Sequence, residues 1–385
     1  MKQLSKMMLA AVASVALAAP AFAWDFSASG SSSATFKQQT VAPAEGDATT
    51  TANFSSSAGG VTVSSSNTDG ANSATFSYTA DYNSDGDALN FDEYVSVSGS
   101  KKVGNWTASS ATTQYMQKDS TAGTPMTSNG SAVITLTDGS ITYKLGNAAH
   151  LSTAEKTSDG PMDGTQDAEA SVDSFNGFSV GLGVGPGTLT VALDMHDNSA
   201  DGKATVLGET QASAIGATGC GAQMTGFGFN FAGDVGADLT FTYGSGSSTI
   251  SAAGCTGDNA TNAFSYSVMG LGVAVPVGGM TIAFDYGTKV ALNTVGTAEG
   301  GSATGGWEIS LVMPVGDATA GVNLSSTATI GTAAGVAGDA AVTGGTELWY
   351  TVPIGPVSLS AGYGSSAVVD GTTTTQLGAE MSMSF

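Results

Sequence analysis

Carboxylates are the side chains of this sequence with the most evident chemistry, and they recur at one phase of a two-residue alternation. Bulky apolar residues hold the other phase, as at Leu189, Val191 and Leu193. The charged residues on the small and polar phase are Asp194, Asp238, Asp285, Glu308, Glu347 and Glu380, with Lys144 and Lys289. Because carboxylates on one face of neighbouring strands raise the local concentration of cations, the spacing predicts a cation-attracting surface.

A second group of acids lies in a long polar segment, residues 147–172. Its acids are Glu155, Asp159, Asp163, Asp167 and Glu169. The segment follows a strand-like stretch and has no alternation of its own, so it is expected to be a loop. A solvated surface loop accounts for these acids as well as a loop that faces a site.

A short run of oxygen-bearing residues has the spacing of a calcium-binding loop. Asp81, Asn83, Asp85 and Asp92 occupy loop positions 1, 3, 5 and 12, and Gly86 occupies position 6. Position 12 normally carries a bidentate Glu, and the flanking residues indicate strands instead of helices. We therefore favour an acidic hairpin loop and keep a structural Ca²⁺ site as the alternative; no other cofactor is expected.

Thiols and imidazoles are too few for a metal or catalytic centre. Cys220 and Cys255 lack a nearby His, so they predict a disulfide in an oxidising compartment instead of a zinc site. The two histidines are His150 and His196, and the Asp194–His196 pair loosely resembles that of the omptin proteases. No further carboxylates are evident opposite this pair, so no catalytic residue is expected.

The composition excludes several classes of protein. The 385 residues include 54 Gly and carry a net charge of −22, and all ten basic residues are Lys. Nucleic-acid binding is excluded because the chain has no basic stripe for a phosphate backbone. Residues 1–23 have the charged start, apolar stretch and Ala21-Phe22-Ala23 cleavage site of a signal peptide, which predicts export.

The elements that must position these residues are strands, and the alternation predicts eighteen of them. Their ranges are 24–36, 52–64, 73–82, 91–101, 104–116, 131–137, 140–146, 173–185, 188–196, 222–232, 235–244, 263–275, 280–290, 306–313, 318–328, 346–353, 357–367 and 375–385. Two N-terminal strands have a weak pattern, so sixteen is equally defensible. Five compact turns near residues 186, 233, 278, 316 and 355 alternate with long polar loops. The alternation changes phase at Met269-Gly270, which predicts a bulge.

The bulky face of these strands is predicted to contact lipid. Tight turns at one end and long loops at the other are typical of membrane barrels. Aromatic residues recur at the loop end, as an interfacial girdle would, at Tyr243, Tyr286, Tyr363, Phe227, Tyr266, Trp307 and Tyr350. The final strand alternates from Leu377 to a terminal Phe385 and resembles the assembly signal of Gram-negative outer-membrane barrels. With the signal peptide, the chain resembles an outer-membrane porin.

This resemblance implies a fold and a function. The fold class is all-β, a transmembrane antiparallel barrel of 16 or 18 strands over residues 24–385. The function is passive diffusion of small hydrophilic solutes and ions, with a preference for cations from the inward-facing acids. The segment 147–172 would be the constriction loop, although the chain lacks Arg for a two-signed field. The implied partners are outer-membrane lipid, the barrel assembly machinery and two further copies in a homotrimer.

Two other readings use the same sequence. An autotransporter-like protein would have residues 24–170 as an exposed passenger and the rest as a translocator. A structural surface protein, such as an adhesin or a mineral-binding protein, would use the acidic charge directly. Single-channel conductance separates a porin from both.

Overall fold

The structure of the chain is a computed structural model. It describes residues 24–85, 88–117, 131–162, 171–195, 205–210, 222–250, 263–295, 298–333, 336–337, 341–369 and 371–385. Within these ranges no helix has the length and apolarity needed to cross a membrane. The expected signal peptide, residues 1–23, lies outside the described residues, and it stays a prediction.

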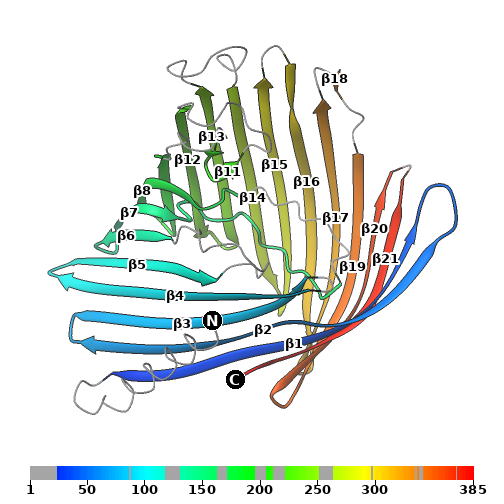
Figure 1. Ribbon diagram of the computed structural model, residues 1–385, viewed down its shortest axis with the longest axis horizontal. Helices are drawn as coiled ribbons and strands as arrows, with labels where there is room; N and C mark the ends of the chain where they lie inside the picture. Colours follow the sequence, from blue (N-terminus) through cyan, green and yellow to red (C-terminus); the bar gives the residue numbers. More distant parts are fainter. Residues whose placement is uncertain are drawn as a thin grey trace. The chain divides into compact units, whose positions relative to one another are not determined.

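All of the regular elements are strands, coloured along the chain in Figure 1. They are β1 (Asp25–Ala42), β2 (Thr49–Asp69), β3 (Asn72–Asp85), β4 (Ala88–Val103), β5 (Trp106–Gln117), β6 (Ala132–Thr137), β7 (Ile141–Ala148), β8 (Phe175–Val184), β9 (Gly187–Asp194), β10 (Thr205–Val206), β11 (Glu209–Thr210), β12 (Ala222–Asp234), β13 (Asp238–Ile250), β14 (Ala263–Val277), β15 (Met280–Val295), β16 (Ala298–Val315), β17 (Ala318–Ala333), β18 (Val336–Ala337), β19 (Ala341–Ile354), β20 (Val357–Val368) and β21 (Thr373–Ser384).

The strands form an antiparallel meander that closes on itself. Each long strand pairs with its neighbours in sequence, and β1 pairs with both β2 and β21. At the closure, Gly30 and Phe385 exchange two backbone hydrogen bonds of 2.7 and 2.9 Å. Leaving aside β10, β11 and β18, which have two residues each, the described residues contain eighteen barrel strands. The all-β barrel is thus confirmed, with eighteen strands and not sixteen.

Tight turns join the strands where the sequence predicts them. The connections at residues 185–186, 278–279, 316–317 and 355–356 have two residues each, and β12 and β13 are joined by residues 235–237, slightly beyond the predicted position. At Gly278 and Gly279 both φ angles are positive, 59° and 88°, which favours glycine and gives the backbone twist that suits a two-residue hairpin. Glycine therefore fixes the register of the hairpin β14–β15.

The two faces of the strands differ as the alternation predicts. On the outer face, the large apolar side chains are exposed, and those of the C-terminal strands include Leu193, Phe227, Ile282, Tyr286, Trp307, Ile309, Leu348, Tyr350, Tyr363, Leu377 and Met381. On the inner face, Thr242, Asn323 and Glu347 are fully buried. So many exposed apolar side chains would be costly in water, and a lipid surface would cover them.

Three sequence expectations need correction. The prediction of a bulge at Met269-Gly270 is wrong, because β14 pairs without interruption with β13 and β15 through these residues. The prediction that Tyr266 belongs to the interfacial aromatic girdle is also wrong, because its side chain lies on the inner face and the residue is 2% exposed. The exposed passenger of residues 24–170 is also wrong, because β1 to β7 belong to the same sheet as the later strands.

The change of phase on β14 has a physical cause other than a bulge. Phe264, Tyr266 and Val268 are at most 3% exposed and belong to a hydrophobic cluster on the inner face. Residues of two loops complete this cluster. The inner positions of β14 are apolar near the loop end because loop side chains, and not water, cover them.

The chain divides into two compact units. Among the described residues, unit 1 comprises residues 24–33, 56–138 and 383–385, and unit 2 comprises residues 34–55 and 139–382. The hydrophobic cluster and the candidate site below lie entirely within unit 2.

Candidate functional site

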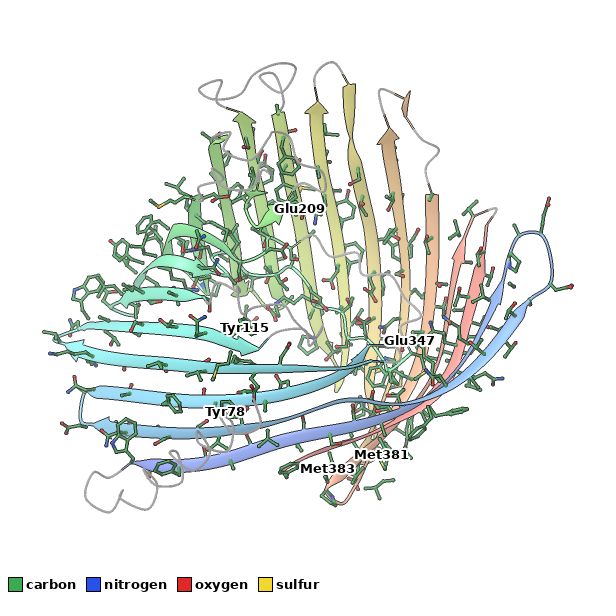
Figure 2. All side chains as sticks on the ribbon, viewed as in Figure 1. Tyr78, Tyr115, Glu209, Glu347, Met381 and Met383 are labelled. Atoms are coloured by element: carbon green, nitrogen blue, oxygen red, sulfur yellow. The ribbon has the colours of Figure 1, made fainter. Side chains whose placement is uncertain are left out.

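The segment after β7 lies against the inner face of unit 2. Residues 149–162 contact β8, β12 to β17 and β19 to β21. Figure 2 shows the segment as a green trace that reaches β19 near the labelled Glu347. Leu151, Ala154, Thr157 and Met162 of this segment are at most 9% exposed. We call residues 149–162 the inner loop. It is the described part of the segment 147–172, whose role as a constriction loop stays a prediction.

Asp285 on β15 holds the middle of the inner loop. Its carboxylate accepts the backbone N–H of Lys156 at 2.9 and 2.8 Å to its two oxygens. It also accepts the N–H of Thr157 at 2.7 Å and the hydroxyl of Thr157 at 2.6 Å. Hydrogen bonds to a charged acceptor are stronger than neutral ones, so this buried carboxylate is an anchor for the loop.

Glu347 on β19 holds the end of the inner loop. Its Oε1 accepts the backbone N–H of Met162 at 2.8 Å, and the side chain is fully buried. A Cβ atom at Gly160 would lie 2.6 Å from Glu347 Oε1 and 2.3 Å from Trp349 Cδ1. Glycine at position 160 is therefore what lets the loop backbone approach these two side chains.

Polar side chains of other strands complete the attachment. Thr242 donates its hydroxyl to the carbonyl of Ser152 at 2.6 Å. Asn323 donates to the carbonyl of Ser158 at 2.6 Å and to Oδ1 of Asp159 at 3.0 Å. An ion pair of 3.0 Å joins the Lys156 ammonium to Asp238. The loop is thus bonded to β13, β15, β17 and β19, and it has one fixed place on the wall.

Glycines on the inner face provide room for the loop. A Cβ atom at Gly272 would lie 1.5 Å from the carbonyl oxygen of Ala154, and one at Gly228 would lie 2.4 Å from Leu151 Cδ1. A Cβ at Gly378 would lie 2.8 Å from Met162 Sδ. Real Cβ atoms do not approach other atoms so closely, so these positions need glycine for packing. Part of the high glycine content thus has a structural explanation.

His150 fixes the start of the inner loop. Its Nε2 lies 2.9 Å from the carbonyl oxygen of Gly146, which can only accept, so Nε2 carries the proton. Its Nδ1 lies 3.0 Å from the hydroxyl of Ser179, and its ring packs against Phe175 at 4.7 Å between centroids. Burial lowers the pKa of His150 below its usual value, so the imidazole is neutral at pH 7.

The acids expected to line a water-filled pore separate into two groups. Asp285, Glu308 and Glu347 lie on the inner face but are at most 2% exposed, and the inner loop holds Asp285 and Glu347. The expectation that these carboxylates are hydrated has to be corrected, because loop and wall atoms surround them. Asp238 is 59% exposed and paired with Lys156.

The other charged residues that the sequence places on the inner face form hydrogen bonds within the chain. Asp194 accepts the backbone N–H of Leu207 at 2.5 Å. Lys144 donates to the carbonyl of Ala149 at 3.5 Å, and Glu380 accepts the hydroxyl of Thr35 at 3.1 Å. Within the inner loop, Glu155 and Asp159 are exposed. The site residues that lie outside the described residues are Asp163, Asp167, Glu169, Cys220, Cys255 and His196, so the disulfide stays a prediction.

The calcium candidates lie on two adjacent strands of unit 1. Asp81 on β3 is the cross-strand partner of Asp92 on β4, and Asn83 pairs with Asn90. Asp85 is the last residue of β3, and β4 begins at Ala88, so Asp81, Asp85 and Asp92 lie on two paired strands. In the described part of the chain no three His, Cys, Asp or Glu residues cluster as a metal site. Calcium binding by these four residues stays a prediction.

The inner face of unit 1 is lined by hydroxyl groups. Side-chain hydroxyls meet across strands at Ser73 and Ser100, 2.7 Å apart, and at Ser96 and Thr113, 2.9 Å apart. A pocket of about 230 Å³ opens beside the first pair. Hydroxyls both donate and accept hydrogen bonds, so this wall is compatible with water and with polar solutes.

Sequence reasoning missed the residues that hold the loop. Lys156, Thr157 and Asn323 have no pattern that marks them, because their partners are more than 80 residues away in the chain. The pair Val206-Leu207, which is fully buried, could have been found as an isolated apolar pair in a polar segment.

Comparison with known proteins identifies the fold. No protein-family model matches the chain, and no curated protein matches it. The outer membrane channel DcaP of Acinetobacter baumannii is a similar solved structure, with a TM-score of 0.56 at 9% identity over 94% of this chain and 97% of that one. An anion-selective porin from Comamonas acidovorans has a TM-score of 0.49 at 14% identity, covering 94% and 100%. Pseudomonas aeruginosa OpdL has 0.49 at 12%, covering 94% and 99%. The first of these likenesses shows that the chain has the fold of an outer membrane channel.

Proposed function

We propose that the chain is a channel of the Gram-negative outer membrane through which small hydrophilic solutes and ions diffuse passively. The observation that carries this proposal is the inner loop, which is bonded to the inner wall by Asp285 and Glu347. A loop bonded to the inner wall would narrow the path through the barrel. The apolar outer face and the fold shared with an outer membrane channel support the same function.

The mechanism is permeation limited by size and biased by charge. A barrel of this many strands leaves an aqueous channel unless loops fill it. The proposal contains no chemical step, and it assigns no residue to catalysis. Asp194, the acid of the candidate catalytic pair, binds a backbone N–H of the chain itself.

The channel would prefer cations. On the described inner wall, Glu155 and Asp159 of the inner loop and Asp238 are exposed, whereas Asp285, Glu308 and Glu347 are covered. Exposed carboxylates in a low-dielectric wall give a negative potential along the path of a solute. Lys156 of the inner loop and Lys289 of the wall are paired with acids, and Lys144 donates to the carbonyl of Ala149.

Export and assembly follow from the same proposal. Residues 1–23 would direct export and be removed, and Phe385 would help the barrel assembly machinery to recognise the last strand. Lipid would cover the exposed apolar side chains, and a homotrimer is the assembly we expect.

Reconstitution in a planar bilayer tests the proposal. We expect stepwise single-channel currents and, under a gradient of KCl, a reversal potential of the sign that cation preference gives. An anion-selective reversal potential would contradict the cation preference and leave the channel intact. Folded barrel in the bilayer without any current steps would contradict the channel itself.

A further inference from the structure

A short hairpin between β9 and β12 has a strained turn. Strands β10 and β11 pair through Val206 and Glu209, and Leu207 and Gly208 form the two-residue turn with φ of 51° and 81°. Leu207 is the non-glycine residue with positive φ in the described part of the chain. A branched apolar residue is unfavourable there, so its side chain must gain something in return.

The gain is burial in a recess of the inner wall. Val206 and Leu207 are 0% exposed. A Cβ atom at Gly246 would lie 2.5 Å from Val206 Cγ1, and one at Gly244 would lie 2.9 Å from Leu207 Cδ1. The two glycines therefore form a recess in the inner wall, and the side chains of Val206 and Leu207 at the tip of the hairpin pack into it.

Polar contacts hold the hairpin on two further strands, β9 and β15. The backbone N–H of Leu207 donates to Oδ2 of Asp194 on β9 at 2.5 Å. Glu209, labelled in Figure 2, forms an ion pair with Lys289 on β15. The Lys289 ammonium also lies 5.8 Å from the centre of the Tyr266 ring on β14. The hairpin is therefore attached by charge and by apolar packing at the same time.

The register of the sheet places the hairpin directly beside the inner loop. Gly226, Gly246 and Tyr266 form one continuous row across β12, β13 and β14, and the hairpin covers this row. In the next row toward the tight turns, Gly228 receives Leu151 of the inner loop. Leu151 and Leu207 belong to the same hydrophobic cluster, so the two elements form one continuous body on the wall.

We infer that the hairpin Thr205–Thr210 is a second narrowing element of the channel, with Leu207 as its anchor, and that it helps to set the largest solute that passes. The inference rests on the proposed function. Without the hairpin, Gly226, Gly244 and Gly246 would leave the wall recessed at this level, and the hairpin fills that recess with side chains and backbone. Release of its anchor therefore widens the path.

Two variants release the hairpin by different routes. Leu207→Asn removes the apolar anchor and keeps a residue that tolerates positive φ, so the turn itself is preserved. Gly244→Val adds a side chain of the wall that occupies the recess in place of Leu207. The atoms nearest to the new Cβ all belong to the side chains of Leu207, Val268 and Val172. Gly181→Ala is the matched control on the inner face, because its Cβ would have ordinary contacts of 3.4 Å or more.

The experiment combines amide hydrogen exchange with bilayer recordings on barrels whose folding is verified by heat-modifiable gel mobility. In the unmodified protein and in Gly181→Ala, we expect slow exchange at residues 205–210. In Leu207→Asn and Gly244→Val, we expect faster exchange there, a higher single-channel conductance, and a shift of the exclusion limit to larger polyethylene glycols.

Two results would overturn the inference while the channel stands. One is free exchange of residues 205–210 in the unmodified protein. The other is a folded variant whose hairpin exchanges freely while its conductance and exclusion limit are unchanged. An unmodified barrel that gives no current would contradict the proposed function. The size-limiting role of the hairpin would then be contradicted as well, because it rests on that function.

Discussion

At the scale of single residues, the acids of the inner face differ in what their carboxylates bind: some accept hydrogen bonds from the inner loop, and others are exposed. Asp285 binds two backbone N–H groups and a hydroxyl of the inner loop, whereas the side chain of Asp238 on β13 is 59% exposed. Alternation alone assigns both kinds of acid to the interior, because it reports the face of a strand and not what covers that face. The covered acids could be identified as anchors only from their partners.

The anchoring role of Asp285 predicts the effect of a nearly isosteric change. Asp285→Asn keeps the shape but replaces one acceptor oxygen by an NH₂ group that faces N–H donors of the loop. We expect the inner loop to become less stable by about 1–3 kcal/mol, the usual loss when a charged acceptor is removed. Amide exchange of residues 155–158 measures the change, and Asp317→Asn in an exposed turn should leave it unaffected.

His150 predicts a dependence of loop stability on pH. Burial lowers the pKa of His150 in the folded protein, with Lys144 acting in the same direction and Asp194 opposing it. The unfolded state binds a proton near pH 6.5, so the stabilisation is complete above that pH and is lost as pH falls toward the folded-state pKa. We expect the protection of the amides of residues 149–152, measured as the intrinsic exchange rate divided by the observed rate, to fall on going from pH 7.5 to 5.

A matched variant isolates the imidazole. Gln in place of His150 has an amide that can donate to the Gly146 carbonyl and does not titrate, so His150→Gln should flatten the profile over the same interval. An equally steep profile in this variant would assign the pH dependence to other groups.

At the scale of elements, the sequence predicts the strands well and their lengths less well. All eighteen barrel strands appear in the predicted order, because bulky residues at every second position mark the outer face. Strand β16 nevertheless begins at Ala298, although the alternation indicates residue 306. Residues 298–306 are rich in Gly, Ser and Thr, and backbone pairing extends through them without any large side chain to reveal it.

Inward-folded segments are the elements that the sequence could not place. The contacts of the inner loop join residues far apart in the chain, such as Thr157 and Asp285, and no local pattern records them. The hairpin β10–β11 has a Leu-Gly turn in place of the Asn-Gly or Asp-Gly that marks such turns. At this turn, the packing of Leu207 in the recess outweighs the local preference for Asn or Asp at a position with positive φ.

Glycine packing on the wall gives a prediction for the inner loop as an element. Gly272→Ala would place a Cβ atom 1.5 Å from the carbonyl oxygen of Ala154, so the loop must leave the wall or the strand must move. We expect a loss of about 1–3 kcal/mol in loop stability, as in other overpacked sites. Exchange of residues 151–157 should accelerate in Gly272→Ala and stay unchanged in Gly181→Ala, which has room for a methyl group. Equal exchange in both variants would show that the loop does not depend on this contact.

At the scale of the whole molecule, the high glycine content and the negative charge have related roles. Glycines on the inner face accept the inner loop and the hairpin, and buried acids hold them there. Glu155 and Asp159 of the inner loop are exposed, as is Asp238 on the wall. In the proposed channel, a passing ion would therefore meet carboxylates of the inner loop as well as of the wall.

This arrangement predicts which acids control ion selectivity. Substitution of Glu155→Gln together with Asp159→Asn should reduce cation preference without a change in the exclusion limit, because both side chains are exposed. The effect should be largest near 0.1 M salt, where the Debye length is about 10 Å, and weak near 1 M, where it is about 3 Å. Reversal potentials under a KCl gradient measure it, with Asp317→Asn as the exposed control away from the loop. Unchanged reversal potentials in the double variant at 0.1 M salt would assign selectivity to other acids, and Asp238 would be the next to replace.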